Sequence, residues 1–76
     1  MRTLCLPVND YWYSLLKEDK LLCDYRPKSD FWIKRLRGKS YDNVKFYHRF
    51  NKNLTPLVFD KCEIKEIEDV FLIYFK

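Results

Sequence analysis

The segment Val70–Phe75 reads VFLIYF, with an apolar or aromatic side chain at every position. Successive side chains of a strand point to opposite faces of its sheet, so a strand of this kind needs cover on both faces. A strongly curved or closed sheet provides that cover in a short chain. With 76 residues, the chain is long enough for one small core. We therefore expect a single domain, residues 1–76, built around a curled sheet that holds this strand.

The rest of the chain alternates between helical and extended patterns. The pairs Asn9–Asp10 and Ser29–Asp30 offer N-cap oxygens for two helices. The first helix is expected to run to about Glu18 and the second to Gly38, which stands where a left-handed C-cap is common. Four further segments have strand patterns ended by proline, glycine or turn residues. These are Thr3–Val8, Leu21–Arg26, Tyr41–Arg49 and Leu57–Ile67.

Leu57–Ile67 changes phase along its length. Leu57 and Phe59 share one strand face, whereas Cys62 and Ile64 share the other, which predicts a bulge or sharp bend near Asp60. The sequence therefore predicts an α+β fold in which a small curved mixed sheet or β-barrel is flanked by two helices. The element order is β-α-β-α-β-β-β.

Positive charge is concentrated between Arg26 and Lys39. This stretch holds six basic residues and one acid, Asp30, while the whole chain has a formal net charge of +4. The rest of the chain is therefore close to neutral. We expect the second helix to turn Trp32 inward and Lys34 and Arg35 outward, giving a cationic face for phosphate groups or for an acidic protein surface.

Asp24 and Arg26 are two residues apart on a predicted strand and so share a face. The pair is either part of a ligand cleft or an ion pair that braces the fold, and arginine suits both roles. Tyrosines near the basic residues offer stacking surfaces for unpaired bases. The predicted binding residues are Asp24, Tyr25, Arg26, Lys28, Lys34, Arg35, Arg37, Lys39, Tyr47 and Arg49.

Several other residue types have simpler interpretations. Trp12 and Trp32 are expected in the core, and His48 is expected to be a buried, hydrogen-bonded imidazole. The three cysteines are scattered without a CxxC pair, so we predict reduced thiols, no metal site and no cofactor. No signal peptide and no apolar run near the ~20 residues of a membrane span occurs. We expect no membrane partner and a soluble protein in the cytoplasm of a bacterial host.

Five segments in order carry a resemblance to a known family: MRTLCLPVNDYWYSLLKEDK, DYRP, WIKRL, YDNVKFYHRF and EDVFLIYFK. Together they are similar to the compact ASCH domain, a PUA-like barrel common in bacterial and phage genomes. The resemblance implies a cleft at the barrel mouth that holds nucleotide or RNA ligands. The family motif is G-x-K-x-x-E-x-R. Aligned on Arg26, it places Asp24 at the acid, Asp19 at the glycine and Leu21 at the lysine.

The resemblance and the charge pattern lead to three functional hypotheses. The first is a non-catalytic RNA-binding or nucleic-acid-binding module of ASCH type, encoded by a phage or mobile element. The second is a small phage inhibitor, of anti-CRISPR or anti-restriction type, that docks on a host nucleic-acid-handling protein. The third is an amidohydrolase acting on acylated cytidine. Leu21 argues against this third hypothesis, because an alkyl chain cannot transfer a proton; only Lys20, one residue earlier, could replace the missing amine.

Overall fold

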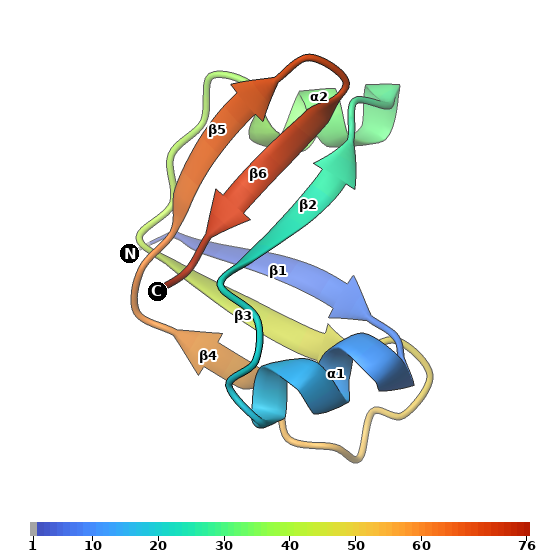
Figure 1. The fold of residues 1–76 in the computed structure, drawn as a ribbon. Helices are drawn as coiled ribbons and strands as arrows, with labels where there is room; N and C mark the ends of the chain where they lie inside the picture. Colours follow the sequence, from blue (N-terminus) through green and yellow to red (C-terminus); the bar gives the residue numbers. More distant parts are fainter. Residues whose placement is uncertain (1) are drawn as a thin grey trace.

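The computed structural model describes residues 2–76, in which six strands and two helices form (Figure 1). Their bounds are β1 Thr3–Val8, α1 Asp10–Lys17, β2 Cys23–Pro27, α2 Asp30–Leu36, β3 Asn43–His48, β4 Leu57–Phe59, β5 Glu63–Ile67 and β6 Val70–Tyr74. The predicted α+β class and both predicted helices are confirmed.

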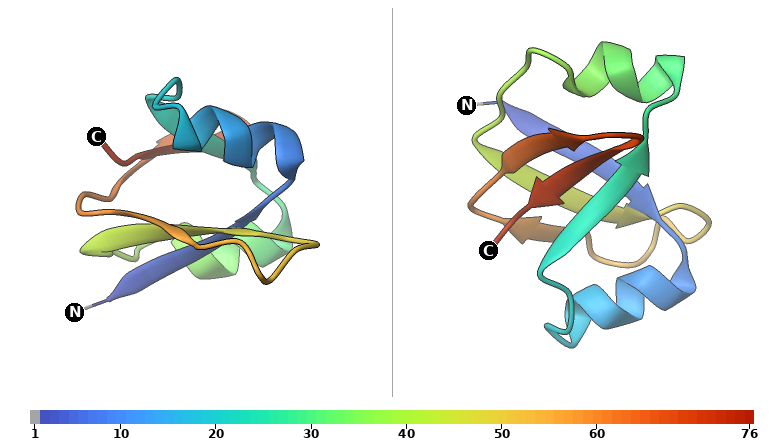
Figure 2. Two further views of the ribbon diagram at one scale, coloured as in Figure 1. Left: turned by 90° about the horizontal axis from the view of Figure 1, so that it is seen from below. Right: turned by 45° about the horizontal axis from the view of Figure 1, so that its top comes forward.

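The strands form two sheets of three strands each. One sheet has the order β1-β3-β4 and the other the order β2-β6-β5. β1 and β3 run parallel, with Thr3 opposite Asn43, while the other three pairings are antiparallel. The two helices lie at opposite ends of this pair of sheets (Figure 2). Each helix therefore closes one end of the space between the sheets.

The sequence predicts one curved or closed sheet, whereas the strands are divided between two separate sheets. The segment expected as a single strand, Leu57–Ile67, is divided: β4 pairs with β3 in one sheet, and β5 pairs with β6 in the other. The chain changes sheet between Asp60 and Cys62, where no strand is formed. The phase change in the sequence marks this crossing. Among the described residues the strands form no closed barrel.

Aromatic rings join the inner faces of the two sheets. Phe46 of β3 lies 5.1 Å from Phe75, measured between ring centroids, and Phe59 of β4 lies 4.7 Å from Phe75. Around them pack fully buried aliphatic residues, which include Leu4, Leu6, Val44 and Ile73. The alternating pattern of Tyr41–Arg49 predicts that Val44, Phe46 and His48 share one strand face, and this is confirmed, since all three are buried. The core is thus a thin layer between two short sheets.

The caps of α1 follow the sequence closely, but its buried face does not. The Asn9 side chain accepts a hydrogen bond from the Trp12 backbone N–H at 2.9 Å, as a helix N-cap should. The spacing of Tyr11, Trp12, Leu15 and Leu16 predicts one apolar helix face. Tyr11 is nevertheless 67% exposed, whereas Tyr13 is buried and donates to the Thr55 carbonyl oxygen at 2.6 Å. That hydrogen bond joins residues 42 apart in the chain, so the helix is rotated to satisfy a contact that no local pattern contains.

The outer face of β6 lacks the cover that its apolar sequence predicts. Phe71, Ile73 and Phe75 are buried against the other sheet, while Val70, Leu72 and Tyr74 are half-buried on the outer face. Neither helix lies over that face (Figure 2).

The free cysteines are half-buried, and burial raises the pKa of the Cys62 thiol. Neither α1 nor α2 has the length and apolar character that a membrane-crossing helix needs.

The β5–β6 hairpin turn allows a direct test of backbone strain. Glu68 has a φ of +42°, in the left-handed region that favours glycine, whereas Asp69 is not among the residues with positive φ. We expect Glu68→Gly to raise the free energy of unfolding by about 0.5–1 kcal/mol. Asp69→Gly, the matched control, should lower it by a similar amount because flexibility is added without relief of strain. Urea denaturation of both variants measures the difference, and equal effects would contradict the assignment.

Candidate ligand cleft

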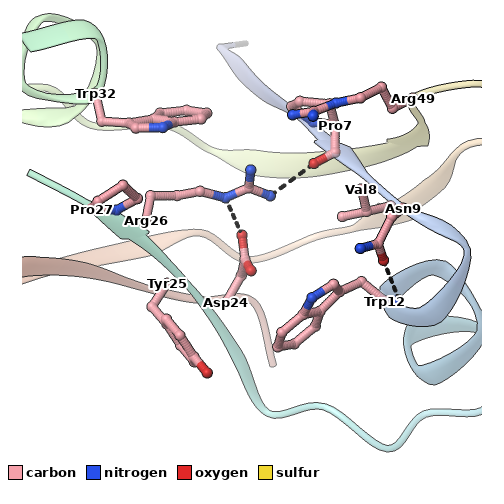
Figure 3. A pocket seen from close by; sticks show the side chains of 10 residues that line it. All are labelled: Pro7, Val8, Asn9, Trp12, Asp24, Tyr25, Arg26, Pro27, Trp32 and Arg49. Carbon is pink, nitrogen blue, oxygen red and sulfur yellow. Dashed lines mark hydrogen bonds and ion pairs between the residues drawn. The ribbon is translucent and has the colours of Figure 1, made fainter. Parts of the chain in front are cut away.

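A cleft of about 360 Å³ opens between the end of β1, the start of α1 and the strand β2 (Figure 3). The start of α2 and the residue after β3 complete its walls. Six of its lining side chains are aromatic or charged. They are Trp12, Asp24, Tyr25, Arg26, Trp32 and Arg49.

Arg26 lies at the centre of the cleft. Its Nε donates to Asp24 Oδ2 at 2.7 Å and its Nη2 donates to the Pro7 carbonyl oxygen at 3.0 Å. The guanidinium also lies over the Trp32 ring, 5.0 Å from the ring centroid, within cation–π range. A guanidinium has five N–H groups, and neither N–H of Nη1 has a hydrogen-bond partner among residues 2–76. Those two donors are available to a ligand.

Asp24 is the acidic partner at the base of the cleft and is 6% exposed. Burial raises the pKa of its carboxyl group, and the positive charge and hydrogen bond of Arg26 only partly offset that effect. The two sequence hypotheses for this pair are therefore not exclusive. Asp24 and Arg26 form an ion pair that braces the fold, and the same two side chains line a cleft.

Two tryptophans, predicted as core residues, pack against the core and also form walls of the cleft, so that prediction is confirmed only in part. Trp12 and Trp32 are half-buried and both line the cleft. Figure 3 shows them on either side of the Asp24–Arg26 pair. The exposed Tyr25 ring meets Trp12 edge-on, with 6.0 Å between centroids. Each tryptophan is the third residue of its helix after the cap, a position that does not by itself distinguish a core side chain from a cleft side chain.

The basic face of α2 is mostly occupied by contacts within the protein, contrary to prediction. Arg35, expected to point outward, is half-buried and donates from Nη2 to the Cys5 carbonyl oxygen at 3.2 Å. Arg37 makes two hydrogen bonds to the Glu66 carboxylate, at 3.1 and 2.8 Å, and Lys28 lies 3.3 Å from the same group. These bonds hold the pKa of Glu66 below its ordinary value. The apparent cationic patch is thus partly neutralised.

The structure therefore divides the predicted binding residues into two groups. Asp24, Tyr25, Arg26 and Arg49 meet in the cleft. The other six lie outside it: Lys28, Lys34, Arg35, Arg37, Lys39 and Tyr47. Lys34 and Lys39 are exposed, and Tyr47 is 39% exposed on the outer face of β3.

His48 fixes the backbone that carries Arg49. The imidazole is buried, its Nδ1 accepts hydrogen bonds from the backbone N–H groups of Phe50 at 3.1 Å and Asn51 at 2.9 Å, and its Nε2 contacts an Asp10 carboxylate oxygen. Because Nδ1 accepts two bonds, the proton of the neutral ring is on Nε2. The predicted buried and hydrogen-bonded imidazole is confirmed, and its role is to shape the turn at one wall of the cleft.

The positions aligned with the ASCH motif lie in and near the same region. Asp19, at the glycine position, has a φ of +62°, and Leu21, at the lysine position, is half-buried against the core. Lys20 is exposed, pairs with Glu18 at 3.2 Å and does not line the cleft. A comparison with known proteins found no matching family model, no matching curated protein and no matching solved structure.

The contacts of Arg35 predict a structural effect that its neighbour Lys34 should not show. Arg35→Ala removes a half-buried donor and leaves the Cys5 carbonyl oxygen without it, so we expect a loss of about 1–3 kcal/mol in unfolding free energy. Lys34→Ala, on the exposed side of the same helix, should change stability by no more than about 0.5 kcal/mol. Thermal unfolding compares the two. If both variants have equally small effects on stability, the Arg35 side chain is exposed to solvent and does not hydrogen-bond to Cys5.

The raised pKa of Asp24 predicts a pH dependence of definite sign. Between the ordinary value of 3.8 and the raised pKa of the folded protein, the native state holds more of this proton than the unfolded chain does. Stability contributed by Asp24 is therefore greatest at low pH and falls as pH rises through the folded pKa. Asp24→Asn lacks this proton equilibrium. We expect the unfolding free energy of Asp24→Asn to improve relative to the native protein as pH rises from about 3 to 7, measured by urea denaturation. A change in the opposite direction would show that Arg26 outweighs burial.

Proposed function

We propose that this chain is a non-catalytic nucleic-acid-binding domain of ASCH type, and that its cleft holds an unpaired base of single-stranded RNA. One observation carries the proposal: Trp12, Trp32 and Arg26 meet in one cleft. Single-stranded nucleic acids are held by aromatic rings that stack on bases and by cations that contact the backbone. The cleft volume of about 360 Å³ lies within the range of small-ligand sites.

The chemistry of each cleft residue suits this ligand. A base can stack one flat face on the Trp12 ring, and its edge carries acceptors for the free N–H groups of Arg26 Nη1. Trp32 supports this arrangement from the other side, because its ring packs against the Arg26 guanidinium. Arg49 is exposed at the rim, where a phosphate group of the chain would pass. In a duplex both faces of a base are stacked and its pairing edge is occupied, so the site favours an unpaired strand.

Two features support the ASCH, PUA-like assignment. The left-handed φ at Asp19 is what the family glycine would provide at that position. Asp24 and Arg26 keep the acid and arginine of the motif, and both side chains line the cleft. Leu21 and Lys20 leave the cleft without an amine at the motif position, which supports binding without catalysis.

A second candidate function rests on the exposed aromatic side chains near the cleft. Tyr11 is 67%, Phe31 58% and Tyr25 55% exposed, and each ring contacts a cleft tryptophan or lines the cleft itself. Exposed aromatic groups of this kind are common anchors of protein interfaces. They suit a phage inhibitor that docks on a host nucleic-acid-handling protein. A pull-down of one such protein from bacterial lysate, competed by purified protein and lost in Tyr11→Ala, would favour this function.

The RNA proposal is tested with a labelled single-stranded RNA of about 12 nucleotides, within the range of known site sizes. We expect Trp12→Ala to weaken binding by about 1–3 kcal/mol at every salt concentration. Arg49→Ala should lower the slope of log affinity against log salt by about 0.7. Fluorescence anisotropy across a salt series measures both effects.

Arg37→Ala is the matched control, because Arg37 is a basic residue outside the cleft that pairs with Glu66. It should leave the affinity for RNA within experimental error of the native value. The same sequence as a duplex should bind more weakly than the single strand. If Arg37→Ala and Trp12→Ala have equal effects, the cleft is not the binding site.

A further inference from the structure

The four edge strands of the two sheets are not equally protected. The edge of β1 is covered by Arg26 and Arg35, which hydrogen-bond to the carbonyl oxygens of Pro7 and Cys5. β2 ends at Pro27 and borders the cleft, and β4 has only three residues. β5 differs from these three. It has five residues without proline or glycine, and no backbone hydrogen bond between described residues reaches it from outside its sheet.

An open strand of this length presents unpaired N–H and C=O groups, which favour pairing with another strand. The β5–β6 hairpin determines which groups these are. Ile67 pairs with Val70 across a turn of two residues, Glu68 and Asp69, so the hydrogen-bonded pairs of the hairpin include Ile67, Lys65 and Glu63. The backbone groups of Ile64 and Glu66 therefore point away from β6, towards the open edge.

The charges of β5 are complementary to those of a second β5 strand. The strand reads EIKEI, and Glu63 and Lys65 lie two residues apart on the outer face, where both are exposed. An antiparallel copy reverses this order. Glu63 of each strand then lies opposite Lys65 of the other strand, which gives two pairs of opposite charges.

We propose that two copies of this chain associate through β5, antiparallel, about a two-fold axis at Ile64. In this register Glu63 lies opposite the partner's Lys65, Lys65 opposite the partner's Glu63, and the two Ile64 side chains meet on the axis. Sheet β2-β6-β5 continues into the same sheet of the second copy. The interface is isologous, as closed dimers require.

Other registers that satisfy the outward backbone groups are less favourable. A shift of two residues one way places Lys65 opposite the partner's Lys65, and a shift the other way places Glu63 opposite the partner's Glu63. Like charges directly opposite each other destabilise a strand pair, whereas opposite charges stabilise it. The axis at Ile64 is the register that avoids both repulsions.

The position of β5 keeps this interface apart from the ligand cleft. β5 and β2 are the two opposite edges of one sheet, and the cleft is lined by β2 (Figure 1). The dimer therefore carries two open clefts at its far ends. The two sheets also become one continuous sheet, so their outer faces lie on the same side. This outer face includes Val70, Leu72 and Tyr74 of each β6, which no helix covers.

Charge-swap variants test the proposal by sedimentation velocity over a concentration series, without nucleic acid. The native chain should show a monomer–dimer equilibrium. Lys65→Glu and Glu63→Lys each create two like-charge pairs and should raise the dimer dissociation constant about tenfold or more. The double variant Glu63→Lys/Lys65→Glu restores opposite charges and should restore dimerisation to within a few-fold of the native value.

The two single variants change exposed side chains, and circular dichroism with thermal unfolding confirms that they fold. A native chain that stays monomeric throughout the series would overturn the proposal. So would folded single variants that dimerise as well as the native chain, or a folded double variant that does not recover.

The register itself is tested by carbodiimide cross-linking of a mixture of ¹⁴N- and ¹⁵N-labelled chains. This reagent joins a lysine to a contacting carboxylate. Peptides that link Lys65 of one isotope to the partner's Glu63 of the other isotope should appear. If links at these residues form only within one isotope, the two strands do not pair in this register and the proposal fails.

Discussion

Two arginines and one tryptophan connect the sheets along the edge where β1 and β2 are not paired. Arg26 and Arg35 both lie over the Trp32 ring, at 5.0 and 5.5 Å from its centroid. Each also donates to a carbonyl oxygen of β1, Pro7 for Arg26 and Cys5 for Arg35. At this edge, hydrogen bonds from side chains take the place of the backbone hydrogen bonds that join the strands within each sheet. Because a guanidinium can stack and hydrogen-bond at the same time, arginine suits this position and lysine does not.

This connection explains why the cleft exists where it does. If β1 and β2 were hydrogen-bonded to each other, the space that holds the Arg26 side chain would be closed. The Arg26 side chain keeps β1 and β2 apart. The buried Asp24 carboxylate fixes the orientation of Arg26, because Asp24 Oδ2 accepts a hydrogen bond from Arg26 Nε at 2.7 Å. The free N–H donors of the cleft and the hydrogen bonds that join β1 to β2 therefore belong to the same Arg26 side chain. A ligand bound as proposed would meet a guanidinium that is already oriented, which lowers the entropy lost on binding.

Local features of the chain were predictable from sequence, and contacts between distant residues were not. The cap at Asn9, the left-handed Gly38 and the inward row of β3 depend on neighbouring residues alone. Arg35 was expected in solvent because a charged residue on a helix usually is, but its partner, Cys5, is 30 residues away in the chain.

The cleft was predictable only in part, for the same reason. Asp24 and Arg26 were found because two residues on one strand share a face. Trp12 and Trp32 were not, because an aromatic residue near a helix start has the same pattern whether it faces a core or a cleft. The division of Leu57–Ile67 between two sheets was visible only as a change of phase, which a bulge would also produce.

The parallel pairing of β1 with β3 also bears on the order in which the molecule folds. Thr3 lies opposite Asn43, so these strands meet only after a loop of about 40 residues has closed, whereas the β5–β6 hairpin closes over two. From loop-closure entropy we expect the hairpin to form early and the β1–β3 pair to form late. The cleft contains the last residues of β1, so it is assembled at the late step. A ligand held there as proposed would bind only the finished structure, and it would slow unfolding by stabilising contacts that the folding transition state has not yet made.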